Sequence, residues 1–167
     1  MSDTANDTAA AAPTGARTMP ITVIAQYLKD LSFENPNAPE ALVATGDGAP
    51  QGSVQVDLRA TPKGGSDFEI VLRLRVEARQ KERLAYLLEM EYAGLIRIGA
   101  VPAEAVEPLV MIEGPRLLFP FARQIVANAT RDGGFGPLLI NPIDFAALYR
   151  DHRQRAAAQQ QQAPASA

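Results

Sequence analysis

Carboxylates are the side chains of this sequence whose spacing most resembles a chemical site. Asp30 and Glu34 lie four residues apart near the end of an alternating stretch, so an extended strand projects both to one side. Asp30 and Glu89 could in principle form an acid/base pair. An exposed sheet face is a poor place for such a pair, because catalysis benefits from a dry pocket. The carboxylates are therefore a poor candidate for a catalytic site.

The other side chains that usually carry chemistry form no catalytic or ligand-binding pattern. The 167 residues include no cysteine and one histidine, His152, which excludes a Cys/His zinc site and a disulfide framework. The serines lack the G-x-S-x-G motif of hydrolases, and the glycines form neither G-x-G-x-x-G nor a P-loop. We therefore predict that the protein is not an enzyme, binds no metal ion and uses no cofactor.

Composition narrows the class of protein further. A net charge of −3 and a pI of about 5.2 argue against a nucleic-acid binder, which needs a basic surface to displace counterions. No apolar run reaches the roughly 18–20 residues that span a bilayer, so no direct membrane insertion is expected. The N-terminal stretch lacks the basic start and apolar core of a secretory signal. The expected location is therefore cytoplasmic.

The length and the apolar content of 47% are typical of one modest domain with tails. Residues 1–19, rich in Ala, Thr, Asp and Gly, are predicted to form a disordered N-terminal arm. Residues 20–150 are the predicted folded domain, and residues 151–167 are a Gln/Ala-rich flexible tail.

Four stretches alternate between apolar and polar side chains with the two-residue period of a strand, at 21–34, 53–60, 68–79 and 84–98. In the first stretch the odd positions are apolar except Lys29, and Asp30 and Glu34 fall on the polar side. Leu87 and Glu89 fall on the polar side of the fourth stretch. Short turns between half-apolar strands predict an antiparallel sheet with one buried face.

The period changes after residue 101. Residues 102–112 and 115–131 are predicted helices, separated by a break at Gly114. A final helix begins near Asn141, with Pro142 in its first turn, and ends near residue 150. Strands followed by helices indicate an α+β domain, in which helices pack on one face of a four-stranded antiparallel sheet.

Two segments carry more apolar surface than a small monomer needs. The predicted helix at 115–131 is apolar on more than one side and includes Leu118, Phe121 and Ile125. Self-association would bury that surface, and a tightly packed monomer core is the alternative. The loop at 135–140, bounded by glycine and proline, is either a core plug under the sheet or the floor of an apolar groove.

Long segments of the chain resemble one known family. They are YLKDLSFENPNAP at 27–39, EMEYAGLIRI at 89–98, and RLLFPFARQIVANATRDGGF followed by LINPIDFAALY at 116–149. These segments resemble SecB, the bacterial protein-export chaperone, and occur in the same order. The resemblance runs from about residue 21 to residue 149.

The resemblance implies an ATP-independent cytoplasmic chaperone that holds the precursors of exported proteins unfolded and delivers them to the SecA ATPase for translocation. It also implies a homotetramer, a dimer of dimers with helices between two sheets. A SecB-like domain that controls a toxin–antitoxin system, or that binds a small apolar ligand, is the alternative function.

The resemblance also assigns residues to surfaces. The zinc-binding C-terminal tail of SecA, which carries its own metal, is expected to dock at Asp30, Glu34, Leu87 and Glu89. The groove for unfolded precursors is expected at Leu42, Val43, Phe135, Leu138 and Leu139. The subunit interface is expected at Leu88, Met90, Tyr92, Leu118, Phe121 and Ile125. The prediction is thus two surfaces for two kinds of partner.

Overall fold

The computed structural model describes residues 20–43 and 48–162, so the predicted arm at 1–19 and the end of the predicted tail lie outside it. In chain order the elements are β1 (Ile21–Glu34), α1 (Glu40–Val43), β2 (Gln51–Gly64), β3 (Asp67–Gln80), β4 (Arg83–Ile98), α2 (Ala103–Pro108), the π-helical turn η1 (Leu109–Glu113), α3 (Gly114–Asp132) and α4 (Phe145–Gln162).

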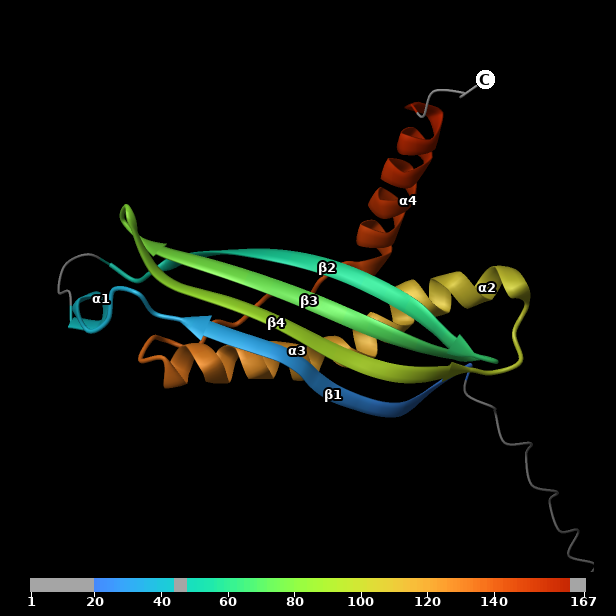
Figure 1. The fold of residues 1–167 in the computed structure, drawn as a ribbon, viewed down its shortest axis with the longest axis horizontal. Coiled ribbons are helices and arrows are strands. Elements are labelled where there is room, and N and C mark those ends of the chain that lie inside the picture. Colours follow the sequence, from blue (N-terminus) through green and yellow to red (C-terminus); the bar gives the residue numbers. More distant parts are fainter. Residues whose placement is uncertain (1–19, 44–47, 163–167) are drawn as a thin grey trace, which may run out of the picture.

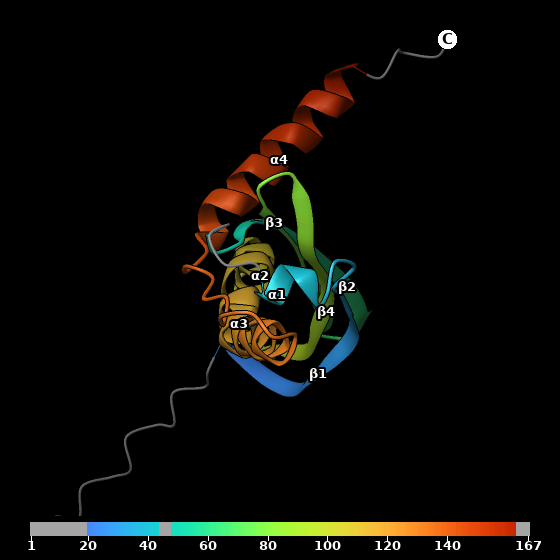
Figure 2. The ribbon, with the colours of Figure 1, turned by 90° about the vertical axis from the view of Figure 1, so that its left-hand side faces the viewer.

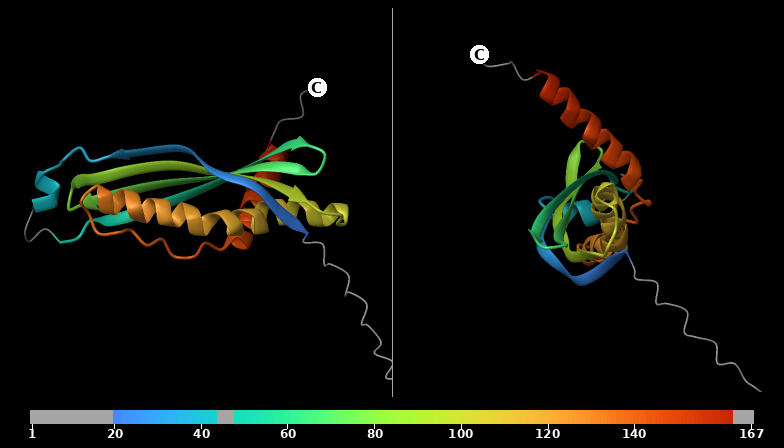
Figure 3. Two further views of the ribbon diagram at one scale, coloured as in Figure 1. Left: turned by 90° about the horizontal axis from the view of Figure 1, so that it is seen from below. Right: turned by 90° about the vertical axis from the view of Figure 1, so that its right-hand side faces the viewer.

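The strands form one antiparallel sheet in the spatial order β1-β4-β3-β2 (Figure 1). β1 and β2 are therefore its two edges. An end-on view shows α2 and α3 on one side of the curved sheet (Figure 2), and α3 runs along the sheet (Figure 3). This arrangement confirms the predicted α+β fold, with helices on one face of a four-stranded antiparallel sheet.

Alternate side chains of β3 and β4 face the helices and form the core. They are Ile70, Leu72, Leu74, Val76 and Ala78 on β3, and Tyr86, Leu88, Met90, Tyr92, Ile96 and Ile98 on β4. α3 covers them with Leu118, Phe119, Ala122 and Val126. Leu118 packs directly on the backbone of Gly94, where an added Cβ would lie 2.6 Å from Leu118 Cδ2.

β1 departs from the predicted alternation because it contains two bulges, at Ile24 and Lys29. Each bulge adds one residue without a partner on β4. The side chains that follow it therefore point to the face opposite to the one that regular alternation predicts. Between the bulges, Tyr27 lies opposite Ala93 and points away from the helices. The prediction that every odd position of this strand faces the core was therefore wrong between residues 24 and 30.

The single chain also leaves β1 exposed on both sides, whereas one buried face was predicted. Its exposed apolar side chains are Val23, Ile24, Tyr27, Leu28 and Leu31. The physical reason is that β1 is an edge strand and α3 lies mainly over β3 and β4, so little of the chain covers it.

The chain is helical without interruption from α2 through η1 to α3, whereas a break was predicted at Gly114. Pro115 falls in the first turn of α3, where its missing N–H is tolerated. Gly114 packs against Ile70 Cδ1 so closely that a Cβ would overlap it. Gly114 is therefore needed for close packing and does not end the helix.

α4 begins after Asp144, whose carboxylate accepts the backbone N–H of Ala147 at 2.9 Å. This bond holds the pKa of Asp144 below its ordinary value.

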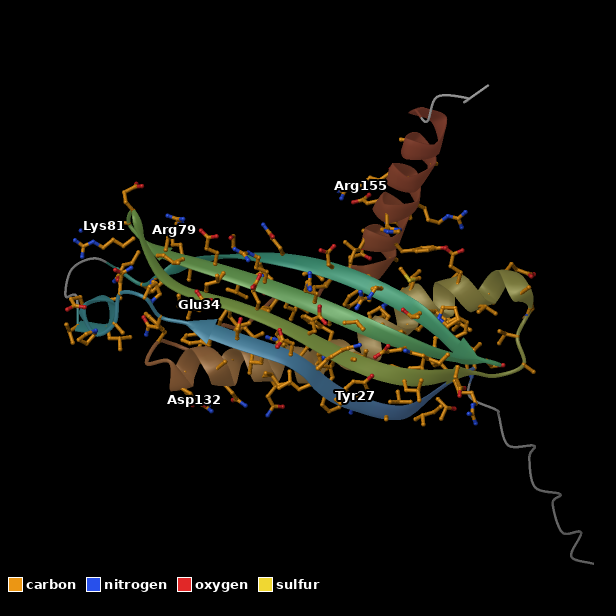
Figure 4. The ribbon with its side chains drawn as sticks, viewed as in Figure 1. Tyr27, Glu34, Arg79, Lys81, Asp132 and Arg155 are labelled. Carbon is orange, nitrogen blue, oxygen red and sulfur yellow. The ribbon has the colours of Figure 1, made fainter. Side chains whose placement is uncertain are left out.

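The helix α4 continues past residue 151, where the flexible tail was predicted to begin. It projects from the sheet, with Arg155 on the projecting part (Figures 1 and 4). No helix in the described part of the chain is both long and apolar enough to cross a membrane.

Candidate functional site

The sheet face turned away from the helices, called the outer face below, carries the four residues predicted for docking. Strand register places Glu34 opposite Leu87 and Asp30 opposite Glu91. Glu89 lies between these two pairs on the same face, because side chains alternate along β4. All four residues therefore meet at the end of the sheet where the β3–β4 hairpin turns, near the labelled Glu34 (Figure 4).

Arginines on β3 already neutralise two of the outer-face carboxylates. Arg75 Nη1 donates to Glu89 Oε1 in a short ion pair. Arg73 donates to Glu91 Oε1 from Nε at 3.0 Å and from Nη2 at 2.5 Å. Glu89 is thus not a free charge, which the sequence pattern missed because cross-strand partners depend on register.

Asp30 and Glu34 differ from Glu89 because their side chains have no hydrogen-bond or ion-pair partner within residues 20–43 and 48–162. Both side chains are exposed on the edge strand. Leu87, which is half-buried, lies beside Glu34 in the same cross-strand row. A cationic partner therefore meets two carboxylates that no described residue pairs with, next to an apolar side chain. No group of three or more His, Asp or Glu among the described residues could hold a metal ion.

Glu69 of β3 is an outer-face carboxylate surrounded by three donors. Tyr27 Oη donates to Glu69 Oε1 at 2.5 Å, and the ammonium groups of Lys29 and Lys63 each lie 2.9 Å from a Glu69 oxygen. These hydrogen bonds, from Tyr27, then Lys63, then Lys29, lower the pKa of Glu69 to about 2. We call these four residues the Glu69 clasp. Sequence reasoning missed it because Tyr27 and Lys29 were assigned to the core face.

The Glu69 clasp should make part of the stability dependent on acid pH. Because folding lowers the pKa of Glu69 from 4.5, its stabilisation is complete above that value and is lost as the pH falls toward 2. We expect Glu69→Gln to lower the free energy of unfolding by about 1–2 kcal/mol at neutral pH and to flatten its acid dependence. Urea unfolding across this pH range measures both effects.

The control for this prediction is Glu82→Gln, which removes an exposed carboxylate at the β3–β4 hairpin. It should keep the wild-type dependence of stability on pH. A Glu69→Gln protein whose stability falls with acid as steeply as wild type would contradict the prediction.

Two residues predicted for the precursor groove join an aromatic cluster at the hairpin end of the sheet. The rings of Phe135 and Tyr86 are 4.9 Å apart, and Tyr86 stacks on Phe33 at 5.5 Å. Leu42 of α1 lies against Gly134, where a Cβ would be 3.0 Å from Leu42 Cδ1. Phe33 and Tyr86 were missed, although both fall on the helix side of their strands and Phe33 lies close to Pro36 and Pro39 in the sequence.

The other predicted groove residues differ in exposure. Val43 is 71% exposed and Leu139 is 64% exposed. Leu138 is half-buried, and its backbone N–H donates to Thr130 Oγ1 at 2.9 Å. Val43 and Leu139 therefore offer apolar surface to a ligand, whereas Leu138 belongs partly to the supporting loop.

A hollow that sequence reasoning did not find lies between the edge strand β2 and the helices, and its larger part is mainly apolar. One part has a volume of about 380 Å³ and is lined by Ala60, Pro62, Phe68, Val106, Val110 and Met111, with Ala103 and Glu107. The other part, about 140 Å³, is lined by Val56, Leu58, Met111, Leu148 and Tyr149, with Asp57, Asp151, His152 and Arg155. Because Met111 lines both, the two parts adjoin along β2.

Three residues predicted for the subunit interface are instead core residues of the single chain. Leu88 and Leu118 have no exposed surface, and Met90 is 1% exposed. In the single chain these three side chains therefore serve the core. Their predicted contact with another subunit stays a prediction.

The remaining interface residues lie nearer the surface. Tyr92 is 7% exposed and stacks on Phe121 with ring centroids 6.5 Å apart. Phe121 is 45% exposed, and Ile125 is half-buried. With Leu117 of α3, which is 42% exposed, they give α3 an apolar side that the described chain does not cover.

Comparison with known proteins identifies the family. A family model described as preprotein translocase subunit SecB matches residues 14–156. The chain belongs to the SecB family. It is 49% identical over 156 residues to the protein-export protein SecB of Afipia carboxidovorans, covering 93% of this chain and 96% of that one. It is 50% identical over 149 residues to the SecB of Nitrobacter hamburgensis, covering 89% and 93%.

A solved structure shows the same fold. A SecB-like chaperone of Mycobacterium tuberculosis, in complex with a peptide of an antitoxin, matches with a TM-score of 0.58 and 16% identity, over 74% of this chain and 91% of that one. The family resemblance drawn from the sequence is thus confirmed, and protein export is the function of this SecB chain. The toxin–antitoxin alternative is not favoured, because the relatives near 50% identity are export proteins.

Proposed function

We propose that this SecB chain holds precursors of exported proteins unfolded in the cytoplasm and delivers them to SecA. The observation that carries the proposal is the separation of two chemically different surfaces. The outer face carries the carboxylates of Asp30 and Glu34, which have no partner among the described residues, and the helix side carries the hollow along β2 with its mainly apolar larger part. In this proposal the chain itself uses no nucleotide, and the energy for transfer enters through SecA.

The proposed partner of the outer face is the cationic, zinc-binding C-terminal tail of SecA. Asp30 and Glu34 attract this tail from the edge of the sheet, and Leu87 gives it an apolar contact. Glu89 contributes when an incoming cation shares or displaces Arg75. Both effects are electrostatic between exposed groups, so binding should weaken as salt increases.

The proposed precursor surface comprises Val43, Leu139 and the hollow along β2. Apolar segments of an unfolded chain gain about 25 cal/mol for each Å² that they bury there. The free edge of β2 also offers backbone groups that an extended segment can pair with. Such contacts carry little sequence information, so many different precursors can bind.

We propose that the chain assembles as a homotetramer, a dimer of dimers. Its support is the uncovered apolar surface of β1 and α3, which includes Leu28, Leu31, Leu117 and Phe121. Four equivalent precursor surfaces on one assembly raise avidity through effective concentration, although each is weak by itself.

The precursor surface is tested by Val43→Ser combined with Leu139→Ser. Both side chains are largely exposed, so the fold should persist. We expect binding of an unfolded precursor to weaken about threefold to tenfold, because two apolar contacts are lost. Fluorescence anisotropy with a labelled unfolded precursor measures the affinity. The control is Glu34→Gln on the outer face, which should bind precursor as wild type does, and equal binding by the double variant would refute the assignment.

A further inference from the structure

The two bulges of β1 make its outer side and its helix side interdependent. Only residues 25–28 lie between the bulges. Because side chains alternate along a strand, the face to which one of these four side chains points fixes the faces of the other three. In the structure, Tyr27 lies opposite Ala93 on the outer face, and Leu28 lies opposite Tyr92 on the helix side. An interaction that holds Tyr27 on the outer face therefore also holds Leu28 on the helix side.

The Glu69 clasp is what holds Tyr27 outward. Tyr27 and Lys29 belong to β1, whereas Glu69 belongs to β3, with β4 between them. Ala93 of β4, which has no exposed surface, is small enough for the Tyr27 ring to pass over it. The clasp thus ties the edge strand to a strand that it does not pair with, at the segment between the bulges.

Lys29, at the second bulge, gives a reason for β1 to depart from regular alternation. In an unbulged strand Lys29 would share the helix face with Leu31 and Phe33, on the side of the sheet opposite to Glu69. The bulge instead lets Lys29 reach Glu69 at 2.9 Å. The ammonium group of Lys29 and the phenol of Tyr27 therefore both favour the bulged arrangement of β1.

On the helix side, the inverted segment presents an apolar surface. Leu28 is 45% exposed and lies opposite Tyr92, whose ring stacks on the equally exposed Phe121. Leu31, at 39% exposure, continues this surface beyond the second bulge. These side chains belong to the surface proposed above for self-association.

We propose that Tyr27 and Lys29, through the Glu69 clasp, are positioning residues for self-association. By holding β1 in its bulged arrangement from the outer face, they present Leu28 on the opposite face to a second copy of this chain. The inference rests on the proposed assembly and names what orients its surface.

The chain contains its own matched control. Lys29 and Lys63 donate to the same carboxylate at the same distance of 2.9 Å, but Lys29 lies on β1 and Lys63 on β2. Lys63→Gln removes one bond to Glu69 but leaves both bonds between β1 and Glu69 in place. Tyr27→Phe and Lys29→Gln each remove one of the bonds that join β1 to Glu69. A merely structural role of the clasp would make all three variants alike.

The experiment measures the dissociation constant of the assembly by sedimentation equilibrium and hydrogen exchange of the β1 amides by mass spectrometry. We expect Tyr27→Phe and Lys29→Gln each to weaken association about threefold to tenfold and to speed exchange in β1. We expect Lys63→Gln to remain within about twofold of wild type in association. Equal effects of the three variants, or no effect of Tyr27→Phe on an assembled wild type, would overturn the positioning role alone. A monomeric wild type would overturn the proposed assembly and the role of the clasp in it.

Discussion

Glu89→Lys is expected to weaken binding to SecA about 10-fold to 100-fold at low ionic strength, with the holding of unfolded precursors unchanged. In the wild-type chain Glu89 is paired with Arg75. The substitution places a second cation beside Arg75, so two like charges then face the cationic tail of SecA. Isothermal titration with SecA and suppression of aggregation of an unfolded precursor measure the two activities on the same protein.

The matched control for this charge reversal is Glu104→Lys. Glu104 is exposed on α2, away from the outer face, and the change in net charge is the same. It should bind SecA as wild type does, which separates a local effect from a general one. If Glu89→Lys binds SecA with wild-type affinity, the outer face is not the docking surface.

The second large effect is expected for Leu118→Ala, which should lower the free energy of unfolding of the chain by about 3 kcal/mol. Leu118 has no exposed surface and fills the space above Gly94, so its truncation leaves a cavity between α3 and the sheet. Urea unfolding monitored by circular dichroism measures the change. Repeating it at several protein concentrations separates the stability of the subunit from that of the assembly.

Phe121→Ala is the paired variant on the same helix. Because Phe121 is 45% exposed, its truncation should cost the single chain only about 1 kcal/mol, mainly through the lost stacking on Tyr92. Its larger effect should be on association, seen as a stronger dependence of unfolding on protein concentration. A Leu118→Ala protein that dissociates without losing stability would restore Leu118 to the interface.

The fold and part of the outer face followed from the sequence because both depend on local periodicity. Alternation along β3 and β4 placed Leu87 and Glu89 on one face, and the structure has them there. Asp30 and Glu34 share that face for a less direct reason. Two bulges, each reversing the side-chain sense, cancel before residue 30, so simple alternation reached the same placement by a different path.

The pairing of charges and the division between core and interface did not follow from the sequence. Arg75 meets Glu89 because register aligns them across two strands. Leu118 and Phe121 are both apolar residues of one helix, and only the packing of α3 on the sheet buries the first and leaves the second 45% exposed.

The sequence by itself determined the family, the antiparallel sheet followed by helices, and the acidic character of the strand at 21–34, since periodicity and residue type are local properties. Only the tertiary structure decided that Glu89 is already neutralised, whereas Asp30 and Glu34 have no partner in the part of the chain that the structure describes. It also decided that Lys29, the one charge among apolar odd positions, is accommodated by a bulge and bound to Glu69. The physical reason is that partners are chosen by register and packing between segments far apart in the chain, which no local pattern contains.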